Sequence, residues 1–193
     1  MTYEDTSPLE ILALQTLNRF RSEDIQPIFG RLLERGLGDY EVACLATEPC
    51  TSLAEKRREI EAALVEIFGD TRISKQEALW VAFRFYLGRV LKGHNREFKA
   101  MAAVIDLTSM NYPALFSCPP ESYVAQEYGI AELYGTYYAW DHEPALEGQS
   151  EHNTAIRNAA RSAMERYYSF GSELPDDLKR IQELIKNENY PAA

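Results

Sequence analysis

The chain has 193 residues, of which 46% are apolar, enough for one domain with a sizeable hydrophobic core. Its 30 acidic residues outnumber its 20 basic residues, giving a formal net charge of −10. This balance argues against nucleic acid and anionic membranes as partners, because both attract clustered Lys and Arg. It fits a basic protein partner, and it also fits a chain whose charge only keeps it soluble. The three cysteines form no CxxC motif and the N-terminus has no signal-peptide pattern, so we expect a cytoplasmic protein without structural disulfides.

Apolar residues recur at helical spacing along the whole chain, and no alternating pattern typical of a β-strand occurs. Ser7, Ser52 and Ser74 each precede a glutamate by three residues, which is the capping-box pattern of a helix start. We therefore predict an all-α, single-domain bundle over residues 1–193. Its eight or nine helices are expected near residues 8–20, 25–35, 39–47, 53–68, 75–92, 96–107, 122–140, 153–170 and 175–187.

Two prolines and a group of glycines refine these helix limits. Asp24 is expected to cap the second helix, which places Pro27 in its first turn, where a missing N–H costs nothing. The sequence Tyr112-Pro113 is expected to break the helical pattern. Glycines suited to a helix C-terminus follow four of the predicted helices, at Gly36, Gly69, Gly93 and Gly171.

The predicted helix at 75–92 is apolar almost all the way round, which is typical of the buried centre of a helical domain. It is too short and contains too many arginines to span a bilayer. We expect Leu79, Trp80, Phe83 and Leu87 to be nearly fully buried. Gly88 lies inside this helix, where glycine costs about 1 kcal/mol relative to alanine, and we attribute it to the close approach of a neighbouring helix.

The segment from residue 100 to residue 156 contains no Lys or Arg, yet it has eight acidic residues and eight aromatic ones. Tyr and Trp concentrate binding energy at interfaces, and carboxylates attract basic partners. The segment is therefore either an acidic, aromatic recognition surface or a part of the core whose tyrosines expose only their hydroxyls. The predicted partner-binding residues are Tyr134, Tyr137, Tyr138, Trp140, Asp141, Glu127 and Glu143. Ile130 and Leu133 are assigned to another, core-facing side of the same helix.

Metal-ligand residue types gather in Asp141-His142-Glu143 and at His152. They lie in a predicted loop and lack the HExxH spacing of a helical zinc site, so solvated loop residues are the simpler interpretation. We keep a metal-dependent enzyme that uses Asp141, His142, Glu143 and His152 as the alternative function. No other catalytic motif is present, and we expect no cofactor.

The stretch from Trp80 to Pro120 resembles an uncharacterised family of small helical bacterial proteins. The resemblance rests on an aromatic-rich helix, Asp106, the Tyr112-Pro113 turn and the segment Phe116-Ser117-Cys118-Pro119-Pro120. Members of that family are often taken to be immunity proteins that neutralise polymorphic toxins. Cys118 departs from the family pattern, in which a methionine is usual, and the last forty residues have no counterpart. The family has no established catalytic residues, so the resemblance assigns none here.

Together these features predict a cytoplasmic protein-binding protein, and most specifically an immunity-type inhibitor of a basic toxin domain. Self-association through the acidic segment is disfavoured, because its carboxylates would face their own copies. The sequence does not indicate an oligomeric state.

Overall fold

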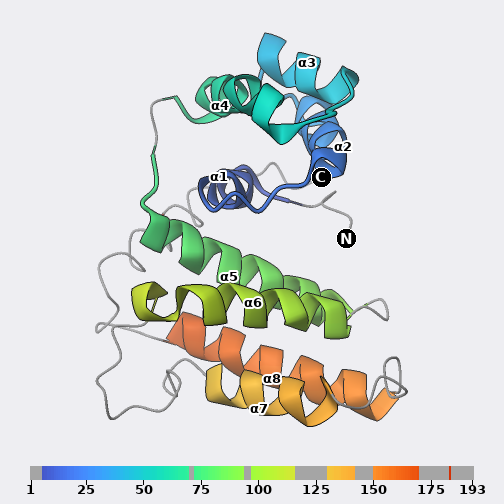
Figure 1. Ribbon diagram of the computed structural model, residues 1–193, viewed down its shortest axis with the longest axis vertical. Helices are drawn as coiled ribbons and strands as arrows, with labels where there is room; N and C mark the ends of the chain where they lie inside the picture. The colour runs from blue at the N-terminus through green and yellow to red at the C-terminus, as the bar shows by residue number, and fades with distance from the viewer. Residues whose placement is uncertain are drawn as a thin grey trace. The chain divides into compact units, whose positions relative to one another are not determined.

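The computed structural model describes residues 6–69, 72–93, 97–115, 130–141, 150–169 and 183, and the regular structure in these residues is entirely helical (Figure 1). The all-α prediction is confirmed, with eight helices and no strand in that part of the chain. No helix there is long and apolar enough to cross a membrane. The predicted helix at 175–187 lies outside the described residues apart from Glu183. The eight helices are α1 (Pro8–Thr16), α2 (Ser22–Glu34), α3 (Tyr40–Thr47), α4 (Leu53–Phe68), α5 (Lys75–Lys92), α6 (Glu97–Leu115), α7 (Ile130–Asp141) and α8 (Ser150–Ser169).

The chain divides into two compact units, Met1–Ala78 and Leu79–Ala193. The first contains α1 to α4, with α3 packed against both α2 and α4. Its core consists of aliphatic side chains and two phenylalanines, among them Ile11, Leu14, Phe20, Ile25, Ile28, Phe29, Leu32, Val42, Leu45 and Ile60. The extent of the predicted single domain, residues 1–193, is not tested by this division and stays a prediction.

The first helix begins as predicted and ends earlier than predicted. Ser7 Oγ accepts from the Glu10 N–H at 3.2 Å, and the Glu10 carboxylate accepts from the Ser7 N–H at 2.8 Å, so the capping box is confirmed. The helix stops at Thr16 instead of residue 20, because Asn18 adopts the left-handed conformation with φ +53°. Asparagine tolerates that conformation and commonly ends helices in this way.

The start of α2 differs from the prediction. The helix begins at Ser22, and Asp24 occupies its third position, where its carboxylate accepts from the Arg21 N–H at 3.2 Å. Asp24 is therefore not the N-cap residue, and Pro27 lies inside the helix and not in its first turn. The end at Gly36 is confirmed: φ is +70°, and the Leu37 N–H donates to the Leu32 carbonyl at 2.9 Å, as in a Schellman motif.

The bounds of α4 match the prediction, but its predicted capping box is absent. Ser52 makes no side-chain cap bond, and the Glu55 carboxylate instead accepts from the Thr51 hydroxyl at 3.3 Å. Gly69 ends the helix with φ +63°, as expected. Both described cysteines, Cys44 and Cys50, are free thiols.

The helix α5, predicted as the central helix, runs from Lys75 to Lys92 as expected, and Gly93 ends it with φ +71°. Leu79, Trp80, Phe83 and Leu87 are all buried, which confirms the expected core face. The Trp80 and Phe83 rings meet edge to face with centroids 6.1 Å apart.

Two further expectations for this helix have opposite outcomes. The capping box of Ser74 is present, because Ser74 Oγ accepts from the Glu77 N–H and the Glu77 carboxylate accepts from the Ser74 N–H. The close approach expected at Gly88 is wrong, since a methyl group added to Gly88 would meet no described atom within 4 Å.

In the second unit, α6, α7 and α8 contact one another pairwise. The helix α6 extends to Leu115, past the residue 107 predicted as its end, so the expected break at Tyr112-Pro113 is wrong. Proline removes one intrahelical hydrogen bond, and near a helix C-terminus this loss interrupts little of the ladder. The helix α8 starts at Ser150, three residues before its predicted start. Residues 122–129 of the helix predicted at 122–140 lie outside the described part of the chain.

Candidate functional site

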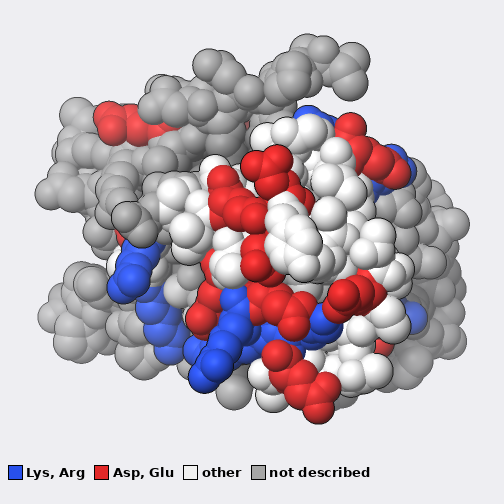
Figure 2. Space-filling model, turned by 90° about the horizontal axis from the view of Figure 1, so that it is seen from above, with Lys and Arg blue, Asp and Glu red and all other residues white. Residues whose placement is uncertain are grey.

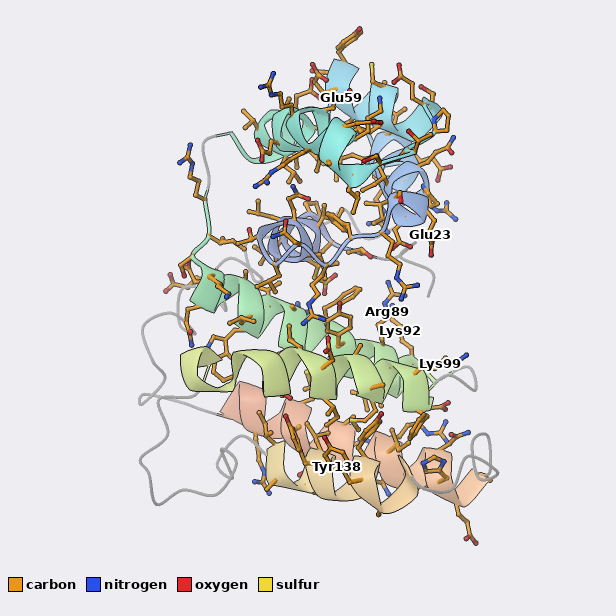
Figure 3. The ribbon with its side chains drawn as sticks, in the orientation of Figure 1. Glu23, Glu59, Arg89, Lys92, Lys99 and Tyr138 are labelled. Atoms are coloured by element: carbon orange, nitrogen blue, oxygen red, sulfur yellow. The ribbon has the colours of Figure 1, made fainter. Side chains whose placement is uncertain are left out.

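The predicted partner-binding residues that the structure describes fully are three tyrosines of α7. Tyr134 and Tyr137 are partly buried, whereas 48% of the Tyr138 surface is exposed (Figure 3). We call these three residues the tyrosine surface. The backbone of Trp140 and Asp141 belongs to α7, but their side chains are outside the described part of the structure, as are Glu127 and Glu143 entirely.

The tyrosines were predicted to lie on a different side of α7 from its core residues, but the tyrosine surface is continuous with the core side. Ile130 and Leu133 are fully buried, which confirms their core assignment. Tyr134 and Tyr137 follow Ile130 at i+4 and i+7 and therefore project toward the same side of the helix. Both contact α6 through their rings or hydroxyls, so only Tyr138, at the edge of this side, keeps a large exposed area.

A hydrogen bond fixes the first of the two inner tyrosines. The Tyr134 hydroxyl lies 3.1 Å from Thr108 Oγ1, and Thr108 is fully buried in α6. Thr108 Oγ1 also lies 2.9 Å from the Val104 carbonyl, an oxygen that can only accept. The single hydroxyl hydrogen of Thr108 therefore goes to that carbonyl, and the Tyr134 hydroxyl is the donor to Thr108.

Ring contacts fix the rest of the cluster. Tyr137 stacks on Phe98 of α6, with centroids 5.0 Å apart and an interplanar angle of 14°. Tyr138 then meets Tyr137 edge to face at 5.3 Å and Tyr134 at 5.8 Å. Such aromatic pairs contribute about 0.5–1.5 kcal/mol each beyond their buried area. Tyr138 is thus an exposed ring supported by two rings that are themselves held by α6.

The candidate metal ligand His152 lies in a different environment from the predicted loop. It belongs to the first turn of α8, is buried, and packs against Phe98 with ring centroids 5.6 Å apart. His142 and Glu143 lie outside the described residues, and within the described ones no group of three or more His, Cys, Asp or Glu side chains could hold a metal ion. The solvated-loop interpretation is wrong for His152, and the metal hypothesis as a whole stays a prediction.

The long segment without basic residues is not isolated from basic residues in space. Glu132 of α7 accepts a hydrogen bond from the Ser162 hydroxyl at 3.1 Å and lies 3.9 Å from the Arg166 guanidinium. Both partners belong to α8, the next helix along the chain. Just before that segment, Glu97 at the start of α6 lies 3.4 Å from Arg157. Glu132 and Glu97 are therefore partly neutralised within the fold.

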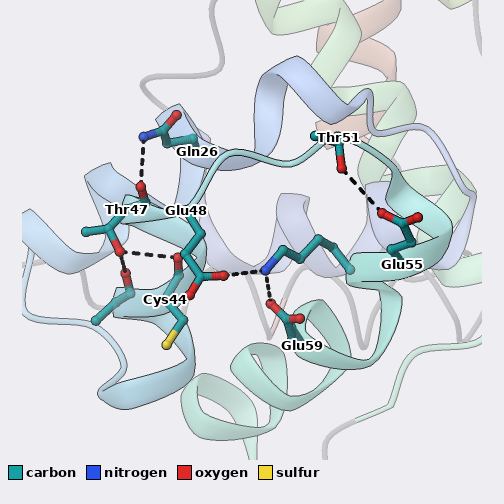
Figure 4. Close-up of polar contacts among 9 residues, drawn as sticks. Gln26, Cys44, Thr47, Glu48, Thr51, Glu55 and Glu59 are labelled. Carbon is teal, nitrogen blue, oxygen red and sulfur yellow. Dashed lines mark hydrogen bonds and ion pairs between the residues drawn. The ribbon is translucent and has the colours of Figure 1, made fainter.

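Acidic side chains in the first unit are engaged in the same way. Lys56 Nζ lies 2.5 Å from Glu48 and 2.6 Å from Glu59, and these two carboxylates raise its pKa well above the ordinary value of 10.5 (Figure 4). Arg57 pairs with Glu61 at 3.0 Å. Seen from above, this unit shows groups of acidic side chains interrupted by a band of basic ones (Figure 2). Lys56 joins the C-cap residue of α3 to α4, whereas Arg57 and Glu61 pair within α4, and both arrangements leave less charge for a partner.

Sequence reasoning missed two residues that position the site, Phe98 and Thr108. Nothing in the sequence pairs Phe98 with Tyr137, which lies 39 positions later in the chain. A threonine at a helix position that faces tyrosines is a weak signal for a buried hydroxyl pair.

The comparisons with known proteins add no relative to this picture. No protein-family model, no curated protein and no solved structure matches the chain.

Proposed function

We propose that this chain is a protein-binding protein, and that the tyrosine surface of α7 contacts the partner through Tyr138. The observation that carries the proposal is a half-exposed ring held by two anchored neighbours, Tyr134 and Tyr137. Tyrosine is enriched among the residues that dominate binding energy, because its rigid ring buries a large area at a low cost in conformational entropy. Because α6 already holds the two tyrosines that support Tyr138, this cost in conformational entropy is lower still.

The small residues next to Tyr138 on α7 support the same proposal. Gly135 and Ala139, which lie three positions before it and one after it, are both exposed and have little or no side chain. A partner can therefore come close to the helix backbone beside the ring. The tyrosine would then insert into a pocket of the partner while the small residues let the surrounding surfaces close and exclude water.

For the class of partner we propose a basic protein, and specifically a toxin domain that this chain inhibits in the cytoplasm by covering its active surface. The net charge of −10 provides the attraction. Since Glu132 beside the tyrosine surface already contacts Ser162 and Arg166, the attraction comes from the charge of the whole chain. Salt should therefore slow association, as exposed charges act over a Debye length of about 8 Å at physiological ionic strength. Inhibition of this kind needs no cofactor.

The first test is genetic. A gene for a toxin with a basic C-terminal domain should lie beside the gene for this chain, and co-expression of the chain should restore growth of cells that make that domain. Tyr138→Ala should reduce the protection. Tyr40→Ala is the matched control, because Tyr40 is a tyrosine of the first unit that is 73% exposed and lies outside the tyrosine surface.

Two results would contradict the proposal. Failure of the unmodified chain to protect against the neighbouring toxin domain would remove the inhibitor function. Full protection by Tyr138→Ala at equal protein level would leave the function possible but would assign it to another surface.

A further inference from the structure

The short helix α3 lacks a cap of its own. It has eight residues, and its N-cap residue Asp39 makes no side-chain cap bond. Helices this short are unstable by themselves, and the N–H groups of the first turn need acceptors from elsewhere. The acceptors in this structure come from α4.

The carboxylate of Glu66 accepts from three backbone N–H groups of the α3 start. Glu66 Oε2 accepts from Asp39 at 3.0 Å and from Val42 at 3.3 Å, and Oε1 accepts from Glu41 at 3.0 Å. In an ordinary capping box, the N-cap side chain serves an N–H in the first turn and the third helical residue serves the N-cap N–H. One carboxylate, 24 to 27 residues away in the sequence, here performs both tasks.

The backbone before α3 is shaped to present these N–H groups. Gly38 has φ +80°, and a Cβ atom there would overlap the side chain of Val42. Val42 is itself fully buried, so it fixes the first turn of α3 against the core. Packing of Val42 thus sets the position of the N–H donors, and the Glu66 carboxylate of α4 accepts their hydrogen bonds.

We propose that Glu66 is a charge-dependent latch: its ionised carboxylate holds the first turn of α3 against α4, and loss of that charge opens this turn while α1, α2 and α4 stay folded. The opposite end of α3 is attached separately, because Glu48, its C-cap residue, pairs with Lys56 of α4 at 2.5 Å. Opening at the Glu66 end therefore leaves α3 attached at its C-terminal end.

No described cation pairs with Glu66, and the ionised side chains that adjoin its donors, those of Asp39 and Glu41, are acids. On α4 the residues one turn earlier are Ala62 and Ala63. Glu66 is exposed, and although some desolvation of its carboxylate against α3 raises its pKa, the N–H donors of Glu41, Asp39 and Val42 outweigh this, so the pKa lies below the ordinary value of 4.5. A lowered pKa means that the latch is complete above the ordinary value and is lost as the pH falls through the folded-state value.

Hydrogen–deuterium exchange of the full chain at pH 6 tests the latch. Glu66→Gln removes the charge at constant size, and the amides of α3 should exchange roughly 2- to 30-fold faster, the range expected for loss of an N-cap. Glu61→Gln, in the same helix, is the matched control and should leave α3 unchanged. Unchanged exchange in Glu66→Gln, or equal acceleration in α1, α2 and α4, would overturn the proposal.

A second measurement needs no variant. In an NMR titration of the unmodified chain, the Asp39, Glu41 and Val42 amide signals should shift with the midpoint of the Glu66 carboxyl, below pH 4.5. Amide signals that ignore that midpoint would also overturn the latch.

Discussion

Truncation of Phe83 tests the assignment of α5 as the central helix of the chain. Phe83 is 1% exposed, and its ring meets the Trp80 ring edge to face with the ring centroids 6.1 Å apart. Phe83→Ala removes the whole ring from a packed site, and such changes cost about 3–5 kcal/mol. For a domain of this size each kcal/mol shifts the melting temperature by about 2–4 °C, so a fall of roughly 6–20 °C is expected.

Thermal unfolding followed by far-UV circular dichroism measures this fall. Gly88→Ala is the matched variant in the same helix, and it is expected to change the free energy of unfolding in the opposite direction. It adds a methyl group where no described atom lies within 4 Å, and it should raise the free energy of unfolding by about 1 kcal/mol. A melting temperature unchanged by Phe83→Ala would refute the central position of α5. A clear destabilisation by Gly88→Ala would show that the space around it is filled.

Two further predictions concern buried polar groups. Thr108→Val removes the hydrogen bond between the Thr108 and Tyr134 hydroxyls and should cost about 0.5–1.5 kcal/mol in denaturant unfolding, and Tyr134→Phe should then add little to it; additive losses would contradict the hydroxyl pair. Burial raises the pKa of Asp24 above its ordinary value of 3.8, so its contribution to stability falls as the pH rises through the folded-state pKa. Asp24→Asn should remove this fall from the pH profile of unfolding, and an unchanged profile would contradict it.

Local sequence patterns predicted most of the fold. The limits of α4 and α5 match the prediction, because each helix begins just after a serine and ends at a glycine. The capping boxes at Ser7 and Ser74 were predictable because each involves two residues only three positions apart. The predicted start of α2 was wrong, because Asp24 lies at the third position of a helix that begins at Ser22 and is not its N-cap.

Two kinds of feature could not be predicted from the sequence: a backbone conformation that a residue permits but does not require, and contacts between residues far apart in the chain. Asn18 is of the first kind, because it ends α1 by its left-handed conformation. The role of Glu66 depends on the packing of α3 on α4. The segment without Lys or Arg was expected to be either an acidic, aromatic surface or a part of the core, and the sequence did not show that the fold brings Arg166 beside Glu132. Of the candidate site, the exposure of Tyr138 agrees with the prediction, but its support by Phe98 and Thr108 required the structure.

The affinity of the purified chain for the basic toxin domain encoded beside it is the most direct test of the proposed binding surface. Isothermal titration calorimetry should give a Kd about 30-fold higher for Tyr138→Ala than for the unmodified chain, which corresponds to about 2 kcal/mol. Tyr40→Ala should bind as the unmodified chain does. Equal affinity of Tyr138→Ala and the unmodified chain, or equal losses in Tyr138→Ala and Tyr40→Ala, would contradict the assignment of binding to the tyrosine surface.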